Sequence, residues 1–474
     1  MILTVDIGTT TLKTALADTH GVLSHLSIQR LENHIEGPVA ECNPYQYLQG
    51  LQEAVKTLPK QQVEAIIISG NAPTVVPVCG MPTVGNGLLT LKAAPARLWL
   101  DQRGKEFSPR VSQAVGSHID GSFYLPKILR IKEKEPELFE QVTCFLTNSE
   151  YLVYALTGTA ATVFPAKHLG QYYWTDSLLD TFGLDRNLFP PFVSPGTILG
   201  TLTKKAADAL GLSQKTKVIA GGPDFYLSIL GSGACSPHLA CDRSGTSEGI
   251  NLCISKQVTS TPLMCYEHPA DSNLWNLSGV ISTTGAAIDW GMRLLGLAKD
   301  DYRTFINMAK TAGKTDVLFH PYLNGERAPI WNSELTGNLS GLRLTTGRGE
   351  IALAIMEGIC LAIYDVMDTM GKLGEAATCL YITDNHSDMG FLSQLKSTVL
   401  QLETRDLTDK PVELMGLSML ASTSLGYYGN LKEADAHLSR PTVAYHPDRK
   451  AGTYYHEKYL RFKELYRQTH QNNT

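Results

Sequence analysis

The sequence of 474 residues lacks a long apolar run that is free of charge. Its most apolar long segment, residues 351–367, contains Glu357 and Asp365, which predicts a buried helix and argues against a membrane span. The first residues form no basic leader, and Asp6 interrupts the first apolar run too early for a signal peptide. We therefore expect no membrane association and a cytoplasmic location.

Paired cysteines are also missing. The nine cysteines are an odd number, lie scattered along the chain and include no Cys-x-x-Cys pair. A disulfide framework usually has an even set, and a zinc site needs closely spaced ligands. The pattern therefore argues against both and predicts reduced thiols.

An excess of positive charge is absent as well. Lys and Arg number 41 against 46 Asp and Glu, which gives a net charge of -5. Without a basic field, neither nucleic acid nor a membrane surface is an expected partner. The chain is 43% hydrophobic and 18% charged, as in soluble globular proteins, and it is too long for a single core. We therefore expect two or three domains.

Short apolar segments that end in glycine alternate with helical patterns. Residues 64–70 and 217–225 predict buried strands, whereas residues 44–57 and much of 125–157 have helical spacing. Near-continuous apolar strands are typical of parallel sheets that are covered on both faces. The fold class predicted is therefore α/β.

The segment VDIGTTTLKTALAD, residues 5–18, predicts two strands joined by a hydroxyl-rich turn. An ordinary surface hairpin explains the turn, but it does not require three threonines beside a carboxylate. The functional interpretation is a phosphate cradle, in which Asp6 holds Mg²⁺ through water and Lys13 neutralises phosphate charge. The structural alternatives are an Asx turn for Asp6 and a solvated side chain for Lys13.

A second hairpin of the same kind occurs at residues 239–255, LACDRSGTSEGINLCIS. The two segments form a weak internal repeat, and small residues at 228–236 suggest a boundary just before the second. We therefore expect two similar domains, residues 1–231 and 232–474, that flank a cleft and hold one phosphate chain from both sides.

Asp224 ends the strand of the first domain, in IAGGPD. Ligand chemistry in α/β proteins gathers at the carboxyl ends of parallel strands. A carboxylate there suits a general base that accepts a proton from an attacking hydroxyl during phosphoryl transfer. The structural alternative is a helix N-cap, where Asp is also favoured.

Taken together, these segments resemble those of the FGGY family of carbohydrate kinases, and most of all those of its xylulokinase-like members. The resemblance covers nearly the whole chain in the family's order. The segments that carry it are VDIGTTTLKTALAD (5–18), LWLDQR (98–103), EYLVYALTGT (150–159), IAGGPD (219–224), SGTSEGI (244–250), TTGAAIDW (283–290) and YLNGERAPIWNSELTGNLSGL (322–342).

The resemblance implies two ribonuclease H-like domains of the actin, hexokinase and Hsp70 type, with ATP and Mg²⁺ as cofactors and a sugar or polyol as substrate. It implies that Asp224 is the catalytic base. The residues implied on the nucleotide side are Asp6, Gly8, Thr9, Thr10, Gly245, Thr246, Gly285 and Asp289, and Lys13 is added to them from its place beside the first turn. Those implied or suggested on the sugar side are Asn71, Trp99, Asp101, Arg103 and Phe225. A homodimer is expected only by analogy with relatives.

Three segments depart from the family pattern. Asp384 and Asn385, in YITDNHSDMGF, replace glycines beside which adenosine lies in the family, although both could bond a ribose or base edge. Asn71-Ala72-Pro73 replaces a more polar segment on the sugar side. Lys167 and His168 add positive charge in VFPAKHLG, where they suit either an anionic substrate group or plain solvation.

The function predicted is a kinase that transfers the γ-phosphoryl group of Mg-ATP to a sugar hydroxyl, with a ketose such as xylulose favoured over other sugars and polyols. The alternative is a catalytically altered member that binds ligands or regulates a partner, suggested by the changed segment around residue 384. An actin-like filament or Hsp70-like chaperone shares the fold class, but it has neither GGPD nor GERAPIW.

Overall fold

The computed structural model describes residues 1–474 except 61–62, 86–87, 384–389, 408–410, 439 and 471–474. The chain divides into two compact units, each with its own apolar core. Unit 1 contains Met1–Gly231 and Pro411–Ser439, and unit 2 contains Ser232–Lys410 and Arg440–Thr474. Residues 411–439, which were expected in the second domain, pack in unit 1.

Unit 1 is built on a six-stranded sheet in the order β14-β15-β6-β1-β2-β3. β1 to β3 form an antiparallel meander, and β6 and β15 continue the sheet parallel to β1. The strands are β1 (Ile2–Ile7), β2 (Thr11–Ala17), β3 (Leu23–Arg30), β6 (Ala65–Gly70), β14 (Ile198–Thr201) and β15 (Lys217–Pro223). Every residue of β1 and β6 is buried, which confirms the buried strands predicted from sequence.

Helices and smaller sheets complete unit 1. The helices are α1 (Tyr45–Lys56), α2 (Ser108–Val115), α3 (Tyr124–Lys134), α4 (Pro136–Phe139), α5 (Asn148–Thr157), α6 (Asp176–Thr181), α7 (Lys204–Leu210), α8 (Asp224–Ser232), α13 (Val412–Ser424) and α14 (Leu431–His437). The short strands are β4 (Asn33–Glu36), β5 (Val39–Cys42), β7 (Val76–Val78), β8 (Thr83–Gly85), β9 (Leu88–Thr90), β10 (Ala96–Arg97), β11 (Cys144–Leu146), β12 (Thr162–Val163) and β13 (Phe192–Val193).

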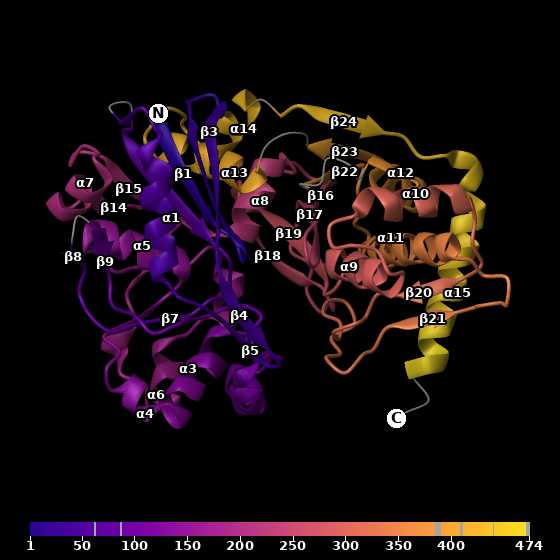
Figure 1. Cartoon of the computed structure of the whole chain (residues 1–474), viewed down its shortest axis with the longest axis horizontal. Coiled ribbons are helices and arrows are strands. Elements are labelled where there is room, and N and C mark those ends of the chain that lie inside the picture. Colours follow the sequence, from indigo (N-terminus) through magenta and orange to yellow (C-terminus); the bar gives the residue numbers. More distant parts are fainter. Residues whose placement is uncertain (61–62, 86–87, 384–389, 408–410, 439, 471–474) are drawn as a thin grey trace. The chain divides into compact units, whose positions relative to one another are not determined.

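α13 comes from the far end of the chain and packs on β1, β2, β6 and β15. Figure 1 shows this late segment, in yellow, beside the indigo strand β1 at the start of the chain.

Unit 2 repeats the same design. Its seven-stranded sheet has the order β18-β19-β17-β16-β22-β23-β24, with an antiparallel meander of β16, β17 and β19 followed by the parallel strands β22 and β23. The strands are β16 (Leu239–Arg243), β17 (Glu248–Ile254), β18 (Met264–His268), β19 (Asp271–Ile281), β20 (Leu318–His320), β21 (Asn338–Ser340), β22 (Cys379–Ile382), β23 (Glu403–Leu407) and β24 (Thr442–Tyr445). The helices are α9 (Gly285–Leu294), α10 (Tyr302–Ala312), α11 (Arg348–Lys372), α12 (Gly390–Leu400) and α15 (Gly452–His470).

The weak repeat in the sequence therefore corresponds to a real repeat of topology, which is the arrangement that the resemblance implied. Segment 351–367, expected as a buried helix, lies within α11 and is largely buried. Across the part of the chain that the structure describes, no helix is both long and apolar enough to cross a membrane.

Candidate active site

The carboxyl ends of β1, β6 and β15 meet at one edge of the first sheet, because the three strands are parallel. Asp6 on β1 lies in register with Ser69 on β6, whose hydroxyl donates to Asp6 Oδ1 at 2.8 Å. Asp6 is only 2% exposed. Burial, together with the charges of Glu413 and Asp224, raises the pKa of Asp6 to about 7, against the opposing effect of Lys13.

Lys13 on β2 stands directly opposite Asp6 in the hairpin. Its ammonium lies 3.7 Å from Glu413 Oε2, at the start of α13. Burial alone would lower the pKa of Lys13, but the nearby carboxylates of Glu413, Asp6 and Asp224 outweigh it and raise the pKa above its usual value. Lys13 is therefore held as a cation, as a phosphate-neutralising role requires.

The first turn closes through a main-chain hydrogen bond from Gly8 N to Thr11 O at 2.9 Å. The Thr9 hydroxyl accepts a hydrogen bond from Trp99 Nε1 at 2.8 Å, while Thr10 is exposed at the tip. Trp99 thus joins the segment expected on the sugar side to the phosphate turn, a contact that neither sequence segment reveals alone.

Asp224 is the first residue of α8 and follows β15 without a break. Its Oδ1 accepts the main-chain N–H of Phe225 at 2.6 Å, and both residues are partly exposed. Strand geometry, expected to continue through Phe225, ends at Pro223 because the helix begins at Asp224. The carboxylate therefore occupies the edge that also holds Asp6.

Asn71 is almost completely buried, and hydrogen bonds fix its orientation. Asn148 Oδ1 accepts from Ser149 N, so Asn148 Nδ2 must donate to Asn71 Oδ1, which also accepts from Thr74. Among the described residues, Asn71 Nδ2 finds no acceptor. Asn71 lines a cavity of about 10 Å³ between the ends of β6 and β15, and this volume holds about one water molecule.

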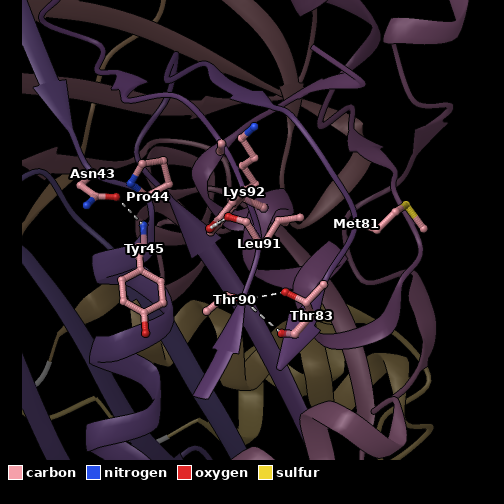
Figure 2. A pocket seen from close by; sticks show the side chains of 10 residues that line it. Asn43, Pro44, Tyr45, Met81, Thr83, Thr90, Leu91 and Lys92 are labelled. Carbon is pink, nitrogen blue, oxygen red and sulfur yellow. Dashed lines mark hydrogen bonds between the residues drawn. The ribbon is translucent and has the colours of Figure 1, made fainter. Parts of the chain in front are cut away.

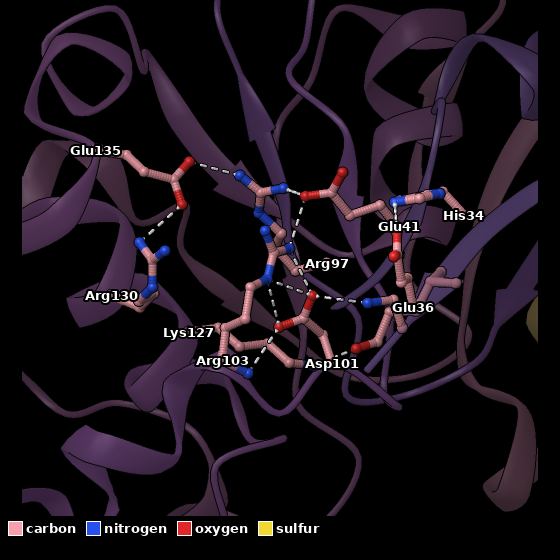
Figure 3. Close-up of polar contacts among 11 residues, drawn as sticks. His34, Glu36, Glu41, Arg97, Asp101, Arg103, Lys127, Arg130 and Glu135 are labelled. Atoms are coloured by element: carbon pink, nitrogen blue, oxygen red, sulfur yellow. Dashed lines mark hydrogen bonds and ion pairs between the residues drawn. The ribbon is translucent and has the colours of Figure 1, made fainter. Parts of the chain in front are cut away.

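Asp101 and Arg103 belong to a network of charges (Figure 3). Asp101 is buried and accepts from Arg103 Nη2 at 2.5 Å and from the main-chain N–H of Ala40 at 3.1 Å. Arg103 Nη2 also lies 2.6 Å from Glu41, which pairs in turn with Arg97. These bonds tie the segment 98–103 to β5, so both side chains have a structural task beside the sugar contact that the resemblance implies.

In unit 2, Gly245 and Thr246 are exposed at the tip between β16 and β17. Gly285 N donates to Gly245 O at 3.0 Å, so the start of α9 packs on this turn. A side chain at residue 285 would place its Cβ 2.4 Å from Gly245 O, which explains the glycine. Asp289, one helical turn later, accepts from the Tyr302 hydroxyl at 2.8 Å.

Behind this second turn lies a buried charge cluster that sequence reasoning missed. Lys396 on α12 lies 2.6 Å from Asp242 Oδ2 and also contacts Glu248, while Ser244 donates to Asp242 Oδ1 at 2.9 Å. Both turns are thus backed by an aspartate, a lysine and a glutamate. The lysine and the glutamate exchange places between the units. In unit 1 the lysine is on the hairpin and the glutamate is on a helix, whereas in unit 2 the glutamate is on the hairpin and the lysine is on a helix.

Asp384 and Asn385 lie outside the described residues. Lys167 and His168 are both exposed. Glu413 is the other residue that sequence reasoning missed, although a signal was present: it is the one charged residue in VELMGLSMLASTS. A lone charge in an apolar helix predicts a buried partner.

A hollow of about 350 Å³ opens beside the start of α1 and the β8–β9 hairpin (Figure 2). Its lining is Asn43–Tyr45, Met81, Thr83, Thr90–Ala93 and Tyr151. Neither Asp6 nor Asp224 lines this hollow, and none of its lining residues was predicted for the site.

Comparison with known proteins decides the family. The profile of the FGGY family of carbohydrate kinases, N-terminal domain, matches residues 1–231, and that of the C-terminal domain matches residues 243–426. The chain belongs to the FGGY family of carbohydrate kinases. It is therefore a sugar kinase with ATP as its co-substrate, which confirms the resemblance seen in the sequence.

Relatives match this FGGY kinase over three quarters of its length or more. A xylulose kinase of Staphylococcus epidermidis is 25% identical over 99% of this chain and 97% of its own. A gluconokinase of Bacillus licheniformis is 24% identical over 77% of this chain and 76% of its own. The crystal structure of ligand-bound xylulose kinase from Lactobacillus acidophilus matches with a TM-score of 0.84 at 23% identity, covering 99% of this chain and 98% of that one. This likeness confirms the two-domain α/β fold.

Proposed function

We propose that this FGGY kinase phosphorylates a hydroxyl of a ketose such as xylulose, or of a related polyol, with Mg-ATP as donor. The observation that carries the proposal is the convergence of Asp6, Lys13 and Asp224 at one edge of the first sheet. Several similar proteins are named xylulose kinase, which favours a ketose as the substrate. A similar gluconokinase makes a sugar acid the second candidate class of substrate.

In the proposed reaction Asp224 accepts the proton of the attacking hydroxyl. The hydroxyl oxygen forms the new bond to the γ-phosphorus, the bond to the bridging oxygen breaks, and ADP leaves with its electron pair. In unit 1, Lys13 offsets phosphate charge and the turn at Gly8–Thr10 supplies main-chain N–H groups and hydroxyls.

The residues at the edge fit a magnesium ion that is held mainly by water and phosphate. Mg²⁺ keeps several waters and uses one or two carboxylates. Within the described residues, no group of three His, Cys, Asp or Glu side chains could chelate a metal, which suits a contact from Asp6 through water. When held by Asp6 through water, the ion would neutralise phosphate charge.

The test measures sugar-dependent ADP release with Mg-ATP across ketoses, aldoses, polyols and sugar acids. Turnover on one class is expected, and Asp224→Asn should lower kcat by about 100-fold or more because a general base is lost. Asp208→Asn is the matched control, since Asp208 is exposed on α7. Full turnover by the Asp224 variant would refute its role.

The regulatory alternative rests on Asp384 and Asn385, which lie outside the described residues, so no structural observation favours it. Calorimetry with ADP and ATP, with and without Mg²⁺, distinguishes the two. A protein that binds neither nucleotide would contradict the kinase proposal.

A further inference from the structure

α13 brings one charge to the catalytic edge of unit 1. Most of its residues are buried, and Glu413 is the one charged residue among them. The Glu413 side chain is itself only 16% exposed. A carboxylate in such surroundings is costly unless other groups compensate its charge, so its contacts indicate why it is there.

Glu413 contacts two elements that carry candidate site residues. One carboxylate oxygen, Oε2, lies 3.7 Å from the ammonium of Lys13 on β2. The other, Oε1, accepts from the Ser228 hydroxyl on α8 at 3.0 Å. Ser228 stands one turn after Asp224, and its hydroxyl also lies 3.0 Å from the main-chain oxygen of Asp224. Glu413 therefore connects the phosphate-side lysine to the helix of the candidate base.

The helix that carries Glu413 is fixed against α8 by contact between the two backbones. A Cβ added to Gly416 would lie 2.0 Å from Leu227 O, and one added to Gly231 would lie 2.0 Å from Val412 O. With no side chains between them at these points, the helices have little freedom to slide. The Glu413 carboxylate therefore has a well-defined place relative to both Lys13 and Asp224.

Three carboxylates compete for one ammonium group at this edge. The charges of Glu413, Asp6 and Asp224 all act on Lys13. Among the described residues, only Glu413 is within ion-pair distance of it. Without Glu413, the attraction to Asp6 and Asp224 would remain and would draw Lys13 toward the candidate metal-associated residue and the candidate base.

We propose that Glu413 is a positioning residue that holds Lys13 away from Asp224 until phosphate oxygens replace it as the lysine's partner. The proposal rests on the proposed function for the role of Asp224. It implies that Glu413 weakens nucleotide binding in the free enzyme, because Lys13 must leave it to reach phosphate. It also implies that turnover depends on Glu413, because a Lys13–Asp224 pair would disable the base.

A double-mutant cycle tests the proposal on the full chain. ADP binding without Mg²⁺ is measured by calorimetry for the wild type, Glu413→Gln, Lys13→Met and the double variant. Glu413→Gln should tighten ADP binding by about fivefold and do so only when Lys13 is present. Glu53→Gln is the matched control, since Glu53 forms an exposed ion pair with Lys56 on α1. Affinity equal to that of the control, or an equal gain without Lys13, would overturn the proposal.

Kinetics supply the second readout. Glu413→Gln should lower kcat per folded enzyme with little change in the KM for sugar, and circular dichroism supplies the folded fraction of each variant. Ser228→Ala removes the hydrogen bond that fixes the Glu413 carboxylate, so Lys13 is held less firmly away from Asp224 and kcat should fall, by less than in Glu413→Gln. If Glu413→Gln does not fold, the Ser228 variant decides, and unchanged kcat there overturns the proposal. The binding cycle needs no turnover, so failure of the kinase assay and failure of this proposal are distinguishable.

Discussion

At the scale of single residues, Glu326 shows how one buried carboxylate can make stability depend on pH. Its Oε1 accepts the main-chain N–H groups of Ser282 and Arg327, both at 2.8 Å. Within the part of the chain described by the structure, its Oε2 is buried without a partner. Burial raises the pKa of Glu326 from 4.5 to about 7, against those two hydrogen bonds.

The raised pKa predicts the sign of a pH effect. Between pH 4.5 and about 7 the folded chain keeps a proton that the unfolded chain loses, so the free energy of unfolding falls as pH rises through this window. Glu326→Gln keeps the accepting oxygen and removes the ionisation. At pH 8 it should be more stable than the wild type by on the order of 3 kcal/mol, with little difference at pH 4.

Urea unfolding at several pH values measures this effect, with Glu457→Gln on the exposed side of α15 as control. A slope between pH 5 and 7 that is the same in Glu326→Gln as in the wild type would contradict the assignment.

At this scale, sequence reasoning could select candidate residues only where the signal is local. Asp6, Lys13 and Asp224 each stand next to a turn or a strand end whose pattern is visible in a few residues, and parallel pairing then brings the strand ends together. It did not find Glu413, because the ion pair with Lys13 joins segments from opposite ends of the chain. Nor could it find the orientation of Asn71, which depends on Asn148 and Thr74.

At the scale of elements, the main chains of helices α8 and α13 come into direct contact. Gly416→Ala would place a methyl group 2.0 Å from Leu227 O, and rigid main chain cannot yield as a flexible side chain does. We expect a loss of about 3 kcal/mol or more in the free energy of unfolding. The kcat should fall as well, since α13 carries Glu413.

Gly371→Ala on α11 is the matched control, because nothing lies within 4 Å of the added methyl group. The same substitution there should raise stability by up to about 1 kcal/mol. Thermal and urea unfolding compare the two variants, and equal effects would show that the close approach of α8 and α13 is unimportant.

At the scale of the whole molecule, residues 1–231 match the family's N-terminal domain but do not complete unit 1. Sequence reasoning placed the boundary after residue 231 from the small residues around it and from the repeated hairpin. It assigned residues 411–439 to the second domain because nothing local distinguishes a helix that returns to the first sheet. Only tertiary packing on β1, β2, β6 and β15 reveals where α13 belongs.

This architecture predicts the behaviour of fragments. A fragment of residues 1–231 leaves the face of the sheet under α13 uncovered, so it should lack a cooperative unfolding transition. A fragment that joins residues 1–231 to 411–438 by a short glycine linker should regain one, since Gly231 lies against Val412. Circular dichroism during heating distinguishes them, and cooperative unfolding of the shorter fragment would contradict the prediction.

The course of the chain also has a consequence for its synthesis. The polypeptide leaves unit 1 after residue 231 and supplies the missing helices only at residues 411–439. At roughly 5–20 residues per second, a ribosome takes on the order of 10–40 seconds to make the stretch between residue 231 and the end of α14. During that interval the first sheet is exposed on one face while most of the second unit emerges. We therefore expect chaperones to bind the nascent chain. Slow translation would lengthen the period in which the nascent chain is most prone to aggregate.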